Sequence, residues 1–158
     1  MRAQEFLIEI RSGLDQYVQR MFPTWPDYVI RDFVYKNIKN MSSQADIQEW
    51  LDGVKRDYGQ LKWSLQQLPI TLDIFDPQTR QRIQARKGGS ANPMQVPNDA
   101  QRHAQQQQII KQQGVSKEPI IVVKTAQGYE LLEGWHRTIQ HLQAYPNGYN
   151  GPAWVGAA

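Results

Sequence analysis

The hydrophobic positions of the first sixty residues recur at the spacing of amphipathic helices. Residues 6–22 carry an apolar side chain every three or four positions until Pro23 interrupts the pattern, and residues 28–38 and 47–54 repeat it. Such stripes are what packing between helices requires. The sequence therefore predicts an all-helical N-terminal extension over residues 1–60, and none of its residues is a candidate for chemistry.

Small polar residues and a glycine mark where these helices should begin and end. Thr24, followed by Trp-Pro-Asp, has the pattern of an N-cap with proline and an acid in the first turn. Ser42 or Ser43 is expected to cap the next helix, and Gly59 is expected to end it.

From residue 61 onward the pattern changes to short β-type segments. Residues 63–65 alternate, and residues 68–75 carry apolar side chains with Pro69 near the start, a position that an edge strand tolerates. Asp76 then has the pattern of an N-cap followed by proline at the first helical position, and it opens a brief predicted helix over residues 77–84.

The rest of the chain alternates helix and strand. The β-branched run at residues 120–123 predicts a strand buried on both faces, and Gly128 is available for a positive φ in the turn that follows. The other predicted elements are a helix over residues 100–113 closed by Gly114, a strand over 129–132, a helix from Trp135 to Tyr145 and a last strand over 152–155.

The segment from Tyr129 to Arg137 has the pattern of a strand that leads directly into a helix. Its apolar run ends at Gly134, which is followed by an aromatic residue, His136 and Arg137. The first amides of a helix have no partner within it and can hold a phosphate, and a glycine lets a ligand approach the main chain closely. Since His136 and Arg137 supply donors beside those amides, the sequence predicts an anion site at this junction.

Composition narrows the choice of chemistry. The chain of 158 residues has no cysteine, which excludes disulfides, thiolate nucleophiles and cysteine-based zinc sites, and its three histidines suggest no transition-metal set. A net charge of +3 permits contact with phosphates but falls short of a dedicated DNA-binding protein. No apolar run approaches the length of a membrane span, so we expect a cytoplasmic protein.

The order of these parts resembles the ParB/sulfiredoxin-like superfamily over residues 61–158. The resemblance rests on the turn at residues 92–97 (Asn-Pro-Met-Gln-Val-Pro), the strand led by Pro119, the strand after it and the Gly-Trp-His-Arg motif at 134–137. In that family a Gly-x-(His/Arg)-Arg motif holds the phosphates of a bound nucleotide. The resemblance implies an α+β fold, with a small mixed sheet and packed helices, preceded here by the helical extension.

The resemblance also implies a set of nucleotide-binding residues: Gly134, Trp135, His136, Arg137, Arg102 and Gln105. Trp135 stands where sulfiredoxins have their reactive cysteine, so we expect no sulfinic-acid repair and interpret this tryptophan mainly as a packing residue. The sequence stops after the core, without the helix-turn-helix domain of ParB partition proteins, so we expect no role in chromosome partitioning.

The activity that the resemblance implies is phosphoryl transfer, as in the related free-serine kinases, or nucleotide hydrolysis. Amides near Gly134 and the adjacent side chains would hold a nucleoside triphosphate, with Mg²⁺ bridging its oxygens. A carboxylate would orient the attacking hydroxyl or water, and the candidates are Asp73, Asp76 and Glu133. Asp76 also suits a helix cap, and Glu133 a charge at the rim of the site.

Two other classes of function remain open. A ParB-like nucleic-acid-binding or nicking module, acting on DNA, would draw its phosphate contacts from a basic cluster that equally suits a solvated helix face: Arg80, Arg82, Arg86 and Lys87. A non-catalytic assembly protein would bind a partner through the N-terminal helices. The first seven residues are similar to the starts of some tailed-phage proteins, which suits a phage-encoded accessory protein acting in the host cytoplasm.

Overall fold

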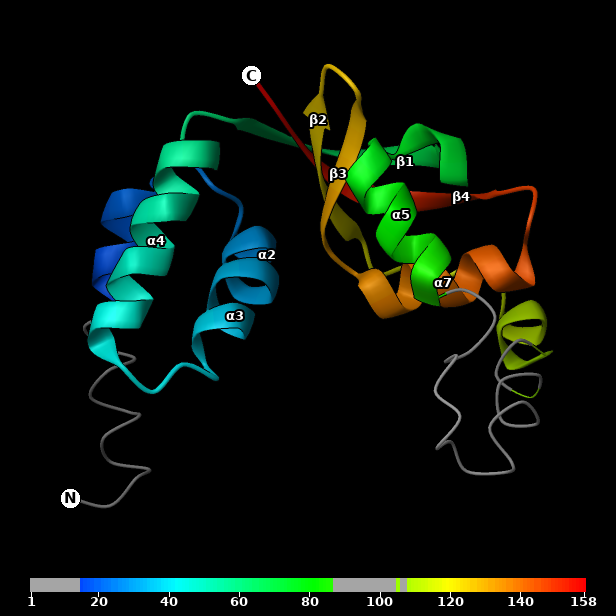
Figure 1. Cartoon of the computed structure of the whole chain (residues 1–158), viewed down its shortest axis with the longest axis horizontal. Coiled ribbons are helices and arrows are strands. Elements are labelled where there is room, and N and C mark those ends of the chain that lie inside the picture. Colours follow the sequence, from blue (N-terminus) through cyan, green and yellow to red (C-terminus); the bar gives the residue numbers. More distant parts are fainter. Residues whose placement is uncertain (1–14, 87–104, 106–107) are drawn as a thin grey trace. The chain divides into compact units, whose positions relative to one another are not determined.

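The computed structural model describes residues 15–86, 105 and 108–158 (Figure 1). By its internal contacts the chain divides into two compact units, one reaching to Lys62 and the other spanning Trp63–Ala157. The first unit is helical and the second contains the sheet, so the chain has the mixed α+β architecture that was predicted.

The N-terminal unit is built from helices whose apolar stripes face one another. Its elements are a helix over residues 15–21, α2 (Asp27–Val29), η1 (Ile30–Tyr35), α3 (Lys36–Ile38) and α4 (Gln44–Tyr58). The elements α2, η1 and α3 follow one another without a break, and η1 is a π-helical stretch. The side chains of Val18, Val29, Val34 and Leu51 are fully buried, which accounts for the helical periodicity of the sequence.

Capping in this unit agrees with the sequence at one helix and differs at another. The hydroxyl of Ser43 accepts a hydrogen bond from the backbone N–H of Asp46, at 3.4 Å, which confirms the cap of α4. The expectation that Thr24 caps the second helix is wrong, because Pro26 occupies the N-cap position of α2. The backbone N–H of Trp25 instead donates to the carbonyl of Phe22, which leaves Thr24 inside a turn.

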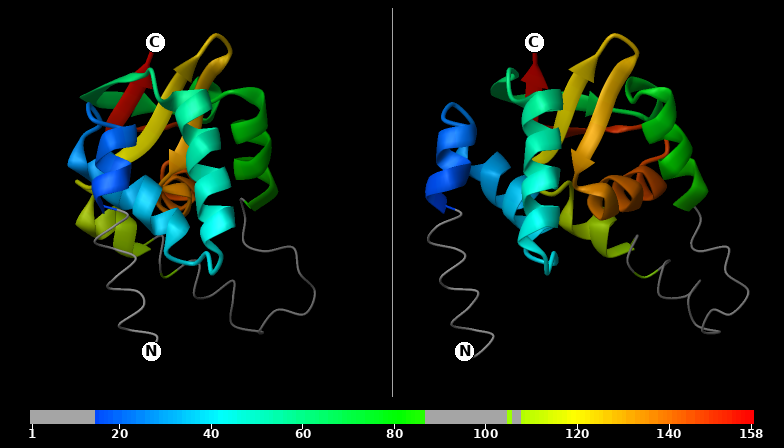
Figure 2. Two further views of the ribbon diagram at one scale, coloured as in Figure 1. Left: turned by 90° about the vertical axis from the view of Figure 1, so that its left-hand side faces the viewer. Right: turned by 60° about the vertical axis from the view of Figure 1, so that its left-hand side comes forward.

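The C-terminal unit is a four-stranded mixed sheet with two helices packed beside it (Figure 2). Its elements are β1 (Lys62–Ile70), η2 (Leu72–Ile74), α5 (Pro77–Arg86), a helical segment over residues 108–113, β2 (Ile120–Thr125), β3 (Gly128–Glu133), α7 (Trp135–Ala144) and β4 (Tyr149–Ala157). The strand order is β1-β4-β2-β3; β2 pairs antiparallel with β3 and parallel with β4. The all-apolar run of β2 lies in the interior of the sheet, where both of its faces are buried.

One apolar core joins the sheet to α5 and α7. Its largest fully buried members are Phe75, Ile70, Ile83 and Leu142, which come from different elements. Burying one such side chain contributes roughly 1.5–3 kcal/mol. The core therefore fixes how the end of β3 meets the start of α7.

The segment after β1 departs from the prediction of a strand over residues 68–75. Residues 72–74 form the 3₁₀ helix η2, and Phe75 forms a single parallel bridge to Tyr129 of β3. The reason is topological: β1 and β3 lie at opposite edges of the sheet, so the chain must leave one edge to reach the other. The apolar pattern of this segment indicates that it is buried, but it does not specify whether the backbone forms a strand or a helix.

Within the ranges that the structure covers, no helix combines the length and the apolar character that crossing a lipid bilayer requires.

Candidate functional site

Gly134 forms the junction between β3 and α7. Its backbone is left-handed, with φ +96° and ψ 24°, and it is the N-cap residue of α7. A Cβ added there would lie 2.7 Å from Cγ2 of Ile120, at the start of β2. Only glycine fits this position, because a side chain would be strained and would also overlap its neighbour. The sequence predicts that Gly134 lets a ligand approach the main chain closely; the close neighbour in the structure is Ile120, through the packing of the junction on β2.

The first turn of α7 presents its backbone amides at this junction. The first hydrogen bond of the helix runs from the N–H of Thr138 to the carbonyl of Gly134, at 2.9 Å. The amides of residues 135–137 precede that bond and point out of the helix end, where the positive end of the helix dipole lies.

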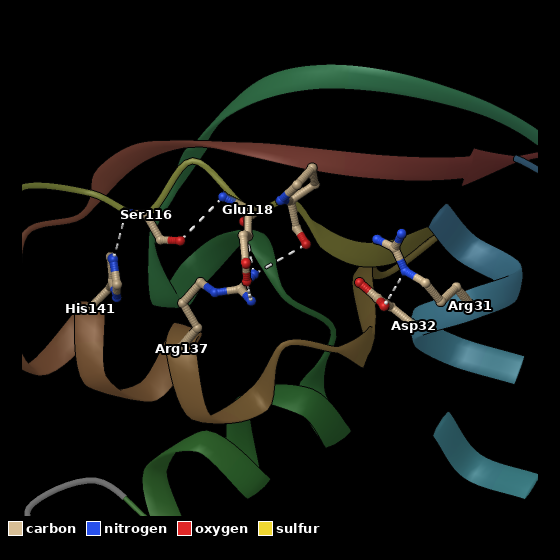
Figure 3. A network of polar contacts seen from close by, with 7 residues as sticks. Arg31, Asp32, Ser116, Glu118, Arg137 and His141 are labelled. Atoms are coloured by element: carbon tan, nitrogen blue, oxygen red, sulfur yellow. Dashed lines mark hydrogen bonds and ion pairs between the residues drawn. The ribbon is translucent and has the colours of Figure 1, made fainter. Parts of the chain in front are cut away.

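Arg137 lies against the residues that lead into β2 (Figure 3). Its Nη1 donates to the carbonyls of Glu118 and Pro119, at 2.8 and 3.2 Å, and its Nη2 donates to Oε2 of Glu118, at 2.9 Å. The side chain of Arg137 is 25% exposed, whereas that of Glu118 is 74% exposed. Arg137 therefore links the first turn of α7 to the residues just before β2, and its Nη2 is bound to the exposed carboxylate of Glu118.

His136 and Arg137 do not lie on one face of the helix. His136 is exposed, and successive residues of an α-helix point about 100° apart. A different cation lies beside the helix start: the guanidinium carbon of Arg82, on α5, lies 4.1 Å from the centre of the Trp135 ring. Trp135 itself packs against the core. The structure thus brings Arg82, a residue considered for nucleic-acid contact, next to the predicted phosphate motif.

The three candidate carboxylates are in different places. Oδ1 of Asp76 accepts from the backbone N–H of Thr79 at 2.8 Å, so Asp76 caps α5, and Asp73 is exposed on η2. The backbone N–H of Asp76 donates to Tyr129, at the start of β3, while Glu133 ends that strand. Four residues of strand span roughly 13 Å. Glu133 is accordingly the candidate adjacent to the Gly134 junction.

A second contact between α7 and the segment before β2 was missed from the sequence, where His141 was treated as isolated. The backbone N–H of Ser116 donates to Nε2 of His141 at 3.1 Å, and the hydroxyl of Ser116 accepts from the N–H of Glu118 at 3.2 Å (Figure 3). Burial, the largest influence, lowers the pKa of His141 from its usual value. The available signal was the four-residue spacing of Arg137 and His141, which puts both on one helix face.

The basic cluster on α5 is divided between faces. Arg82 and Arg86 are four residues apart and share an exposed face, whereas Arg80 is half-buried on another. Lys87, Arg102 and the turn at residues 92–97 lie outside the described residues, and Gln105 is helical and exposed.

Among the described residues, no three or more histidine, aspartate or glutamate side chains come together as a metal-binding group. No family model, curated protein or solved structure matches this chain.

Proposed function

We propose that the unit spanning Trp63–Ala157 binds a nucleoside triphosphate with its phosphates at the start of α7, and transfers or hydrolyses the terminal phosphoryl group. The observation that carries the proposal is the left-handed Gly134, which turns β3 directly into α7, so that the helix starts next to Arg82, over Trp135, and Arg137. An anion there would meet backbone donors and the positive end of the helix dipole together. This function is also the one implied by the resemblance of the chain to ParB/sulfiredoxin-like proteins.

Two arginines would supply the charge that a triphosphate needs. Arg82 lies over Trp135, at the first residue of α7. Arg137 would keep its bonds to the Glu118 and Pro119 carbonyls and exchange its bond to the Glu118 carboxylate for one to a phosphate oxygen. This exchange is favoured by exposure, because an ion pair open to water contributes at most about 1 kcal/mol.

Phosphoryl transfer at this site would need a metal ion to neutralise charge and a carboxylate to orient the nucleophile. Mg²⁺ held largely by the phosphates would neutralise charge on the transferred group, and a carboxylate would orient the attacking hydroxyl or water. Glu133 suits that role best by position, since it directly precedes Gly134, whereas Asp76 lies at the other end of β3, beside Tyr129, and Asp73 is carried by η2.

Calorimetry with ATP, GTP, CTP and UTP, each with Mg²⁺, tests the proposal. Arg82→Gln and Arg137→Gln should each weaken binding at least tenfold, because a charge-assisted hydrogen bond contributes about 1.5–3 kcal/mol. Lys124→Gln is the matched control, because it also removes one positive charge. Lys124 is exposed near the end of β2, opposite Tyr129 at the start of β3, and β3 reaches the Gly134 junction only at its other end. Absence of binding at millimolar nucleotide, or equal affinity in all variants, would overturn the proposal.

Turnover is tested separately from binding. The products formed from any bound nucleotide should include its diphosphate, and Glu133→Gln should slow their formation while leaving the affinity within about twofold. A Glu133→Gln variant as fast as the wild type would remove this residue from the mechanism and leave a nucleotide-binding protein.

The exposed face shared by Arg82 and Arg86 favours a second proposal, binding to the phosphates of DNA. In that case retention on DNA falls with salt, Arg86→Gln weakens it, and added nucleotide leaves it unchanged. Retention that is independent of salt and of Arg86 would exclude this alternative. If neither ligand binds, an assembly role through the N-terminal helices is left.

A further inference from the structure

The hydrogen bond between Ser116 and His141 fixes the protonation state of a buried imidazole. Nε2 of His141 accepts the backbone N–H of Ser116, so this nitrogen carries no proton and the ring proton resides on Nδ1. The side chain is 5% exposed, and among the described residues its Nδ1 is buried without a hydrogen-bond partner. A neutral ring is therefore part of the folded structure.

His141 and Arg137, one helical turn apart on α7, both bind the segment of residues 116–119. Residues 116–119 are tied to α7 at two points, by Nε2 of His141 at Ser116 and by the guanidinium of Arg137 at Glu118 and Pro119. The Ser116 hydroxyl, which accepts from the Glu118 N–H, couples the two points (Figure 3).

Burial opposes a positive charge on His141, and the groups around the ring offset that effect only in part. Arg137 lies four residues earlier on α7: its backbone favours the charged ring, and its guanidinium charge opposes protonation to a smaller extent. From β4, the Tyr149 ring lies 5.1 Å from the imidazole between ring centres, and burial raises the pKa of that phenol to about 12, so it is neutral. On the 116–119 segment itself, Lys117 is exposed and the Glu118 carboxylate is bound to Arg137. No carboxylate among the described residues is hydrogen-bonded to the imidazole to stabilise its charged form.

We propose that His141 is a pH-sensitive switch for the 116–119 segment: protonation at Nε2 turns the acceptor of the Ser116 N–H into a donor, breaks that bond and releases the segment from α7. Two facing donors repel, and the added charge lies beside Arg137. Release of Ser116 loosens Glu118, and with it the carboxylate that occupies Arg137. The switch acts whether or not a nucleotide binds; where one does, acid frees Arg137 for the anion.

The direction of the effect follows from linkage. Burial lowers the pKa of His141 in the folded state, so the unfolded chain takes up the proton first as the pH falls. The contribution of the neutral histidine is fully present above its unfolded pKa, about 6.5, and is lost progressively below it.

Amide hydrogen exchange of the full chain, followed by NMR at pH 7.5 and 5.0, tests the switch. The protection factor of the Ser116 amide, which corrects for the intrinsic pH dependence, should fall at least tenfold at pH 5.0. The control amide is Leu131, which donates to the hydroxyl of Thr79, a group that does not titrate in this range. It should change less than twofold. Equal protection of Ser116 at both pH values would overturn the proposal.

A variant separates the imidazole from general acid effects. In His141→Gln the side-chain oxygen can accept from Ser116 at every pH, so the Ser116 protection factor should become independent of pH. The same pH-dependent loss in this variant would overturn the proposal. Should the variant fold poorly, the ring ¹⁵N shifts of the wild type decide: a proton on Nδ1 at pH 7.5 supports the switch, and a proton on Nε2 refutes it.

Discussion

Replacing Gly134 with alanine tests the geometry on which the candidate site depends. The substitution forces a Cβ into left-handed backbone, at φ +96°, and brings it within 2.7 Å of Cγ2 of Ile120. Gly114 provides a matched comparison in the same unit, because its φ of +81° is also left-handed but a Cβ there meets nothing within 4 Å. The pair of variants therefore separates backbone strain from steric overlap.

The expected magnitudes differ by the overlap term. Left-handed conformation costs an alanine about 1–2 kcal/mol, which is the whole effect expected of Gly114→Ala. Gly134→Ala adds an overpacking cost of about 1–3 kcal/mol, because Ile120 is 2% exposed and has little room to move. The free energy of unfolding should thus fall by about 2–5 kcal/mol in Gly134→Ala.

Urea denaturation followed by circular dichroism measures both variants. With a slope of about 1–3 kcal/mol per molar urea, Gly134→Ala should lower the midpoint by roughly 1–2 M, and Gly114→Ala by clearly less. The double variant Gly134→Ala, Ile120→Ala should be less destabilised than the sum of its single substitutions, because truncating Ile120 removes the overlapping atom. A Gly134→Ala variant no less stable than Gly114→Ala would refute this geometry.

Three further predictions concern contacts around the site. Glu118→Gln should change the free energy of unfolding by less than about 1 kcal/mol, because the ion pair is exposed. Arg137→Gln should lower it by about 1–3 kcal/mol, because two backbone carbonyls also lose their donor. Equal losses of the two variants in urea denaturation would contradict this. Asp76→Ala should cost about 1 kcal/mol through loss of the α5 cap and Asp76→Asn much less, and a neutral alanine variant would rule out the capping role. Burial raises the pKa of Tyr149 to about 12, so the neutral phenol stabilises the fold fully below its unfolded pKa near 10, and this contribution is lost as the pH rises toward 12. Between pH 9 and 12 the free energy of unfolding should therefore fall by roughly 2 kcal/mol less in Tyr149→Phe than in the wild type. The same fall in both proteins would contradict this prediction.

Local chemistry predicted much of the second unit. The β-branched run became β2, Gly128 has a positive φ, and Asp76 caps α5, each through a rule that acts over a few residues. Interactions of this range can be inferred from composition and spacing alone, because the partners are neighbours in the chain.

Predictions failed where the outcome depended on distant parts of the chain. The apolar segment at residues 72–74 reads as a strand, but it forms η2 because β1 and β3 lie at opposite edges of the sheet. The placement of Arg82 over Trp135 joins residues 53 positions apart in sequence, and no local pattern of α5 specifies it.

The partner of Arg137 shows the same limit within the candidate site. The sequence indicates a basic residue in the first turn of a helix, which suits a phosphate equally well as a carboxylate. Its carboxylate and carbonyl partners come from Glu118 and Pro119, and their proximity depends on how β2 and α7 pack. The helix start was therefore predictable, whereas the group that occupies its arginine was not.

The most direct measurement of phosphate binding at the start of α7 is a ¹⁵N NMR titration of the full chain with each Mg²⁺-nucleoside triphosphate. The amide signals of residues 135–137 and the side-chain Nε signals of Arg82 and Arg137 should shift together and saturate with one dissociation constant, while the amide of Lys124 at the far end of β2 stays in place. Titrations in which no nucleotide moves these signals, or in which only signals elsewhere move, would contradict the proposed site.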